Sequence, residues 1–127
     1  MMNAWAIAAV GLGGALGAIA RFAVSAAIGA HHVFPWATLA INIAGSFAIG
    51  LIWGAYGATE WFQQWGRLFL VVGLLGGFTT FSAFSLETLN LLQGARYGLA
   101  ASYVLASVLA CLAAVIAGER AGQIWLG

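Results

Sequence analysis

The stretch that decides the fold is Gly73-Leu-Leu-Gly-Gly-Phe-Thr-Thr-Phe-Ser-Ala-Phe-Ser85, in the middle of a long apolar segment. It is a poor helix former. Gly76 and Gly77 each cost about 1 kcal/mol relative to alanine. The phenylalanines and threonines that follow have stiff side chains, or hydroxyls that compete for backbone hydrogen bonds. We therefore expect a break here. Backbone that leaves the helix inside a bilayer must be buried in protein or line a wet cavity, so this stretch should face a partner or a pore.

The composition is that of a membrane protein. Hydrophobic residues make up 64% of the 127 residues and charged residues 6%, with a mean hydropathy of +1.03. So few charges cannot cover a soluble domain of this length. No basic segment precedes the first apolar run, which is therefore expected to be a retained span. The single cysteine, Cys111, cannot form an internal disulfide and is expected to be a small buried apolar residue. A net charge of +1 indicates no nucleic-acid partner.

Four segments reach the ~20 apolar residues that a helix needs to cross a bilayer. They are Trp5–Ile28, Trp36–Tyr56, Leu68–Leu92 and Tyr97–Ala117. The connectors are short, so residues 1–127 should form a single all-α bundle of four transmembrane helices with a break in the third. Small-xxx-small pairs, which let helix backbones approach closely, occur in three spans. These pairs are Gly13 and Gly17, Gly50 and Gly54, and Gly73 and Gly77. The sequence leaves open whether they pack within one subunit or between subunits.

The arginines give no preferred orientation. With four spans, both termini and the Gly57–Trp65 connector share one side of the membrane. Arg67 and Arg120 lie on that side, whereas Arg21 and Arg96 lie nearer the other. Because the arginine and lysine bias sets topology, an even distribution permits both orientations and hence an antiparallel dimer.

Polar side chains within the spans gather in the half of the subunit away from the termini. They come from all four spans and are Arg21, Thr38, Asn42, Glu87, Tyr103 and Ser107. In the second and fourth spans the polar residues are spaced i, i+4, so each pair lies on one face of its helix. Phe81 and Phe84 are spaced i, i+3 in the third span.

Intramembrane polar groups are functional candidates by default, but each has a structural alternative. A lone asparagine also joins helices by hydrogen bonds, and phenylalanine rings in a span often face lipid. Arg21 and Glu87 lie at similar depth and could form a buried ion pair.

A donor-rich zone with one deep carboxylate suits an anion better than a cation. Phenyl ring edges carry partial positive charge, and a small anion sheds its water only where fixed donors replace it. His31 and His32 have no further ligands placed to complete a metal site. There is no nucleophile–base arrangement and no phosphate loop, so the sequence predicts that the protein is not an enzyme.

At these residues the sequence resembles the Fluc-type (CrcB-like) family of bacterial fluoride ion channels. The matching motifs are Gly13-Gly14-Ala-Leu-Gly17-Ala-Ile-Ala-Arg21-Phe22, Thr38-Leu-Ala-Ile-Asn42-Ile-Ala-Gly45-Ser46-Phe47 and Gly73-Leu-Leu-Gly76-Gly77-Phe-Thr79-Thr80-Phe81-Ser82-Ala-Phe84-Ser85, with Glu87 beyond. The match at Tyr103 and Ser107 rests on spacing. Ala83 departs from the pattern, since the family often has a hydroxyl residue there.

The resemblance implies a dual-topology homodimer of antiparallel subunits in the bacterial cytoplasmic (inner) membrane, with two pores that export cytoplasmic fluoride passively. Asn42 would donate a hydrogen bond to the anion, and Phe81 and Phe84 would present ring edges to it. The rest of the path would be lined by Thr38, Glu87, Tyr103 and Ser107. Arg21 would hold positive potential at a vestibule. A structural Na⁺ at the dimer centre would be bound by the backbone carbonyls of Gly77 and Thr80.

Two other classes are weaker. A small dual-topology multidrug transporter, which exchanges protons for cationic drugs, needs a carboxylate in its first span, where this sequence has Arg21 and no acidic residue. A membrane scaffold subunit would explain the packing glycines, but it gives no reason for donor side chains beside a broken helix.

Overall fold

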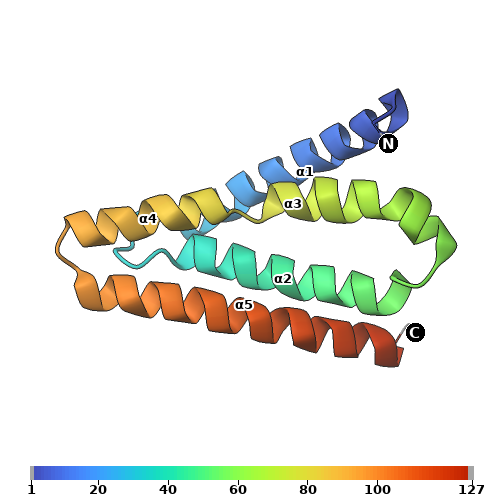
Figure 1. Ribbon diagram of the computed structural model, residues 1–127. Helices are drawn as coiled ribbons and strands as arrows, with labels where there is room; N and C mark the ends of the chain where they lie inside the picture. Colours follow the sequence, from blue (N-terminus) through green and yellow to red (C-terminus); the bar gives the residue numbers. More distant parts are fainter. Residues whose placement is uncertain (1, 126–127) are drawn as a thin grey trace.

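The computed structural model describes residues 2–125 and is entirely helical outside its connectors. Its elements are α1 (Ala4–Ile28), α2 (Trp36–Tyr56), η1 (Phe62–Leu75), α3 (Gly76–Phe78), α4 (Phe81–Gln93) and α5 (Tyr97–Trp125). The elements η1, α3 and α4 form one interrupted span, so the chain has four helices long and apolar enough to cross a membrane. The prediction of a multi-pass, all-α membrane protein is confirmed. Both ends of the described chain lie at the same end of the molecule (Figure 1).

Two helices extend beyond the expected spans. The third begins at Phe62, before Leu68, and the fourth ends at Trp125, after Ala117. The predicted limits were placed at the first polar side chains. Long polar side chains can reach from the apolar region to water. The helices can therefore continue beyond the apolar segments. The pattern of residues also did not predict that η1 is wound as a π-helix, a form usually limited to single turns.

Helices α2 and α5 run parallel and pack along their lengths (Figure 1). Glycines on both helices make this close approach possible. A Cβ atom on Gly50 would lie 2.2 Å from the carbonyl oxygen of Val115, and one on Gly118 would lie 2.2 Å from that of Phe47. No side chain fits at such distances, so α2 is held at a fixed position against α5.

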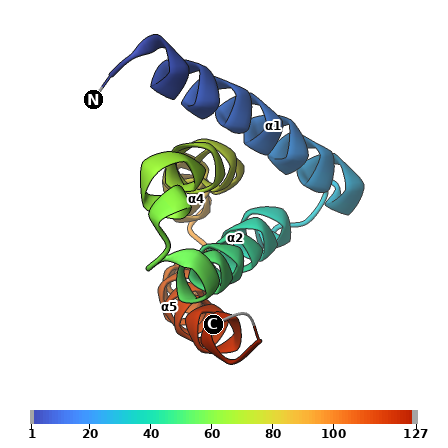
Figure 2. The ribbon, with the colours of Figure 1, turned by 90° about the vertical axis from the view of Figure 1, so that its right-hand side faces the viewer.

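The other close pair is α1 with η1 and α3. Figure 2 shows α1 crossing obliquely over the third span, on the side away from α5. A Cβ atom on Gly17 would lie 2.0 Å from the carbonyl oxygen of Leu74, and one on Gly77 would lie 2.5 Å from that of Gly14. The small-residue pairs therefore pack within one subunit, which was one of the two alternatives left open by the sequence.

The predicted break lies at two threonines. Thr79 (φ −82°, ψ 158°) and Thr80 (φ −152°, ψ 117°) are extended. The N–H and Oγ1 of Thr79 both donate to the carbonyl of Leu75, at 3.0 and 2.9 Å. Oγ1 of Thr80 accepts from the N–H of Ala83 at 3.1 Å and caps α4. Gly77 lies within the helical turn α3, and its carbonyl accepts a hydrogen bond from Nε of Arg21 at 3.1 Å.

The glycine contacts predict a contrast between two substitutions in α1. Gly17→Ala places a methyl group against the backbone of Leu74, and such overpacking costs about 1–3 kcal/mol. Gly11→Ala meets nothing within 4 Å, and alanine favours the helix by about 1 kcal/mol. Unfolding in detergent should therefore show a loss of stability for Gly17→Ala and none for Gly11→Ala. Equal stability of the two variants would contradict the packing described for α1.

Candidate functional site

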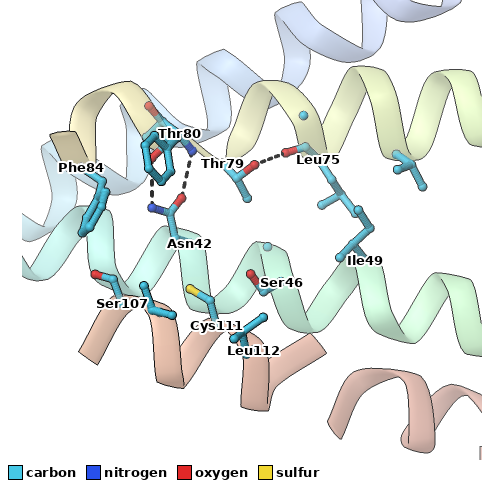
Figure 3. A pocket seen from close by; sticks show the side chains of 15 residues that line it. Asn42, Ser46, Ile49, Leu75, Thr79, Thr80, Phe84, Ser107, Cys111 and Leu112 are labelled. Carbon is cyan, nitrogen blue, oxygen red and sulfur yellow. Dashed lines mark hydrogen bonds between the residues drawn. The ribbon is translucent and has the colours of Figure 1, made fainter. Parts of the chain in front are cut away.

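Asn42 on α2 forms a reciprocal pair of hydrogen bonds with the backbone of Thr80. Its Nδ2 donates to the Thr80 carbonyl at 3.0 Å, and the Thr80 N–H donates to its Oδ1 at 2.9 Å (Figure 3). A break in a membrane helix leaves backbone groups that must find other partners. Asn42 is the partner of both the N–H and the carbonyl of Thr80. A side-chain amide has two N–H donors, so one donor of Asn42 remains after the pairing.

An open cavity of about 450 Å³ lies against this pair, bordered by α2, α5 and the third span (Figure 3). None of the described residues that line it is acidic or basic. Its polar lining consists of Asn42, Ser46, Thr79, Thr80, Ser107 and Cys111. Ser107 is 7% exposed, and its Oγ has no hydrogen-bond partner within residues 2–125. A buried hydroxyl left without a partner costs about 1–3 kcal/mol, so this cavity offers an unused donor.

Phe81 and Phe84 both line the cavity, but their surroundings differ. Their ring centroids are 5.3 Å apart at an interplanar angle of 58°. Phe84 is 9% exposed and packs on Tyr103, with 5.1 Å between ring centroids, whereas Phe81 is 77% exposed. Phe84 is therefore part of the subunit core, and Phe81 is open to lipid or to another subunit.

Three predicted residues meet at one carboxylate. Glu87 on α4 accepts from Oγ1 of Thr38 at 2.9 Å and from the hydroxyl of Tyr103 at 3.0 Å. Thr38 is 6% exposed and Tyr103 is fully buried, so both donors are held rigidly. Ser107, one turn beyond Tyr103 on α5, lines the cavity instead. Similar depth in the bilayer thus predicted that Thr38, Glu87 and Tyr103 lie in one polar zone, although not their bonding.

Arg21 forms a contact that the sequence did not predict. Its Nε donates to the carbonyl of Gly77 at 3.1 Å, and it does not line the 450 Å³ cavity. The alternative of an ion pair with Glu87 is wrong, because within residues 2–125 Glu87 accepts from Thr38 and Tyr103. Arg21 therefore attaches α1 to the turn that precedes the break. Its expected role at a vestibule stays a prediction.

The carbonyls expected to bind Na⁺ each accept one side-chain hydrogen bond, Gly77 from Arg21 and Thr80 from Asn42. A carbonyl oxygen has two lone pairs. Each of these two carbonyls therefore has one lone pair left that could coordinate a cation. The guanidinium charge disfavours a cation at Gly77, whereas the neutral amide adds no charge beside Thr80. Of the two carbonyls, that of Thr80 therefore fits Na⁺ better than that of Gly77, and a site for the ion needs further oxygens from a second subunit. No group of His, Cys, Asp or Glu within the described residues could hold a metal.

Cys111 is one of the cavity-lining residues that sequence reasoning missed. It was expected to be an inert buried residue, but it is only half-buried and lines the cavity with Ser107. Its position, one turn after Ser107 on the same face of α5, was the available signal.

These features define a multi-pass membrane protein in which a broken span, an asparagine and an uncharged, donor-lined cavity lie together. Residues 8–119 match the family model described as CrcB-like protein, Camphor Resistance (CrcB), and the chain belongs to this family.

Several relatives carry the name fluoride-specific ion channel FluC. The one from Opitutus terrae is 45% identical over 122 residues, 88% of each chain. The one from Magnetococcus marinus is 44% identical over 120 residues, 93% of this chain and 98% of the relative. The one from Agrobacterium fabrum is 46% identical over 120 residues, 92% and 95% of the two chains. These names describe ion channels rather than enzymes, in agreement with the sequence prediction.

The Glu87 cluster predicts the effect of removing one hydroxyl. Tyr103→Phe keeps the buried ring but loses the donor to the carboxylate, and hydrogen bonds to charged groups contribute about 1.5–3 kcal/mol. Tyr97→Phe is the matched control, since Tyr97 is 66% exposed. Unfolding in detergent should show the loss for Tyr103→Phe only. If both variants are as stable as the original protein, the hydrogen bond from Tyr103 to Glu87 does not stabilise the fold.

Proposed function

We propose that the protein is the subunit of a fluoride-selective channel that exports cytoplasmic fluoride passively across the bacterial cytoplasmic membrane. The observation that carries the proposal is the uncharged cavity against Asn42, which offers N–H and O–H donors and no carboxylate. The names of the relatives support the same ion. A cation would find no counter-charge in this cavity, and a substrate that needs covalent chemistry would find no nucleophile with a base.

The conduction path follows from the donors. Fluoride is small and strongly hydrated, and it leaves water only where fixed donors replace its shell. The remaining N–H of Asn42 and the hydroxyl of Ser107 are donors that the described part of the fold leaves uncommitted at the cavity. The rings of Phe81 and Phe84 add edges of partial positive charge. Beyond Phe84 the path continues past Tyr103 to the carboxylate of Glu87 and the hydroxyl of Thr38.

Two copies of the chain complete the channel. Phe81 is 77% exposed beside backbone that lipid cannot hydrogen-bond, which favours cover by a second subunit. An antiparallel two-fold dimer would bring both breaks together and form two equivalent pores. Na⁺ bound by the carbonyls of Gly77 and Thr80 from both copies would offset their mutual repulsion. It would also add positive potential for the anion.

The multidrug-transporter alternative is disfavoured by the same observations. The only ionisable side chain of α1 is Arg21, and no acidic residue lines the 450 Å³ cavity. Neither a proton carrier in the first span nor a counter-charge for a cationic drug is present at this site.

A fluoride electrode tests the function directly in liposomes that contain only this protein. Wild-type protein should release fluoride rapidly and chloride poorly. Asn42→Asp replaces the donor by a negative charge, and two unit charges ~4 Å apart repel by about 4 kcal/mol at an effective dielectric of 20. Since about 1.4 kcal/mol is tenfold in rate, fluoride flux should fall by orders of magnitude.

Asn3→Asp is the matched control for that experiment. Asn3 caps α1 by accepting from the N–H of Ala6 at 2.8 Å, and aspartate caps equally well. This variant should conduct like the original protein. Chloride release as fast as fluoride release, or normal flux through Asn42→Asp, would contradict the proposal.

Labelling of single cysteines tests the antiparallel arrangement. In a Cys111→Ser background, Ala58→Cys places an exposed thiol at the terminal end, and Ala30→Cys places one at the opposite end. An impermeant maleimide should label about half of each variant from either side of intact membranes, because both orientations are present. Labelling of each variant from one side only, and from opposite sides, would exclude the antiparallel dimer.

A further inference from the structure

A second cavity, of about 430 Å³, lies at the end of the subunit away from the termini. It is bounded by the connector between α1 and α2, the start of α2 and the end of α4. Thr38 and Glu87 are part of its lining, so it leads directly to the outer end of the polar cluster. Unlike the 450 Å³ cavity, it is lined by charged and strongly polar side chains, among them His32, Asn90 and Arg96.

Arg96 is an exposed residue that lines this cavity, and its backbone is held by the turn between α4 and α5. Ala95 has a left-handed backbone (φ 57°), and the N–H of Arg96 donates to the carbonyl of Leu91 at 2.8 Å. The guanidinium is permanently charged and carries five donors. The acidic residue in the same lining, Glu87, has one oxygen bonded to Thr38 and the other to Tyr103. Both carboxylate oxygens of Glu87 therefore already accept a hydrogen bond, and within residues 2–125 neither is bonded to Arg96.

Two further features add hydrogen-bond donors. His32 has an imidazole with at least one N–H donor in either protonation state, and it lies against His31 with 4.5 Å between ring centroids. The start of the 21-residue helix α2 also borders the cavity, with no side-chain hydrogen bond capping its first turn. Its free N–H groups carry the positive end of the helix dipole. The cavity thus combines the positive charge of Arg96, several hydrogen-bond donors and space for a hydrated ion.

We propose that this cavity is a capture site for a small hydrated monovalent anion, where Arg96 and His32 concentrate the ion before it reaches Thr38 and Glu87. The inference rests on the proposed channel function and assigns the mouth of its path. The arginine predicted at a vestibule was Arg21, but Arg21 is bonded to Gly77 and does not line this cavity. Clefts lined by charge of one sign raise the local concentration of ions of the other sign. The effect of Arg96 on fluoride flux should therefore be largest at low fluoride concentrations.

The test compares fluoride flux through Arg96→Gln and the Arg96→Gln/His32→Gln double variant in liposomes over a range of fluoride concentrations. The matched control is Arg67→Gln, which removes the same charge from an exposed position at the opposite end of the subunit. The half-saturating fluoride concentration should rise about tenfold in Arg96→Gln, with further loss in the double variant. Maximal flux should be unchanged, and Arg67→Gln should match the original protein. Because exposed charges are screened beyond a Debye length of ~3 Å at 1 M salt, the difference should vanish there.

A second readout separates this inference from the proposed function. Sodium fluoride, with sodium gluconate as the control salt, is titrated into detergent-solubilised protein while the side-chain NMR signals of His32 and Asn90 are followed. Shifts with fluoride that are lost in Arg96→Gln support a capture site, even if the original protein releases no fluoride and the channel proposal fails. Normal conduction with Arg96→Gln equal to Arg67→Gln at every concentration, or no shift in the titration, would overturn the capture site.

Discussion

The structure depends on the pair of hydrogen bonds between the amide of Asn42 and the backbone of Thr80. A helix broken at bilayer depth exposes backbone groups, and each one left without a partner costs several kcal/mol. Thr79 closes the helix before the break and Thr80 caps the helix after it. The N–H and the carbonyl of Thr80 find their partner in Asn42 on α2, so Asn42 must be held in place. The glycines that press α2 against α5 provide that constraint.

The pairing also determines the electrostatics of the polar zone. Because Asn42 satisfies Thr80 without a formal charge, the cavity beside the break stays uncharged while keeping a spare donor. The charged groups lie on either side of it. Arg21 is bonded to the backbone of α3, and Glu87 is bonded to two hydroxyls farther along the subunit. An anion that enters beside Arg96 would pass from a charged mouth, past one restrained carboxylate, to neutral donors and aromatic edges.

Much of this arrangement could be predicted from the sequence, for reasons that are local. Span lengths follow from apolar runs, and the break follows from residues whose side chains compete with the helix. Their depth in the bilayer correctly predicted that Thr38, Glu87 and Tyr103 lie in one polar zone. The partner of Arg21 was not predictable in this way, since charge complementarity pointed to Glu87. The acceptor is a backbone carbonyl near the break, and a sequence pattern does not reveal that. The approach of Gly50 and Gly118 likewise required the helix positions themselves.

Hydrogen exchange at the backbone amide of Thr80 tests the central claim most directly. In threonine-labelled protein the Thr80 N–H is bonded to Asn42, and the Thr79 N–H, bonded to Leu75 at 3.0 Å, is an internal reference. Asn42→Leu should accelerate exchange strongly at Thr80 and leave Thr79 unchanged, because only the first amide loses its partner. Equal exchange at Thr80 in both proteins would contradict the account, since the break would then be held by something other than Asn42.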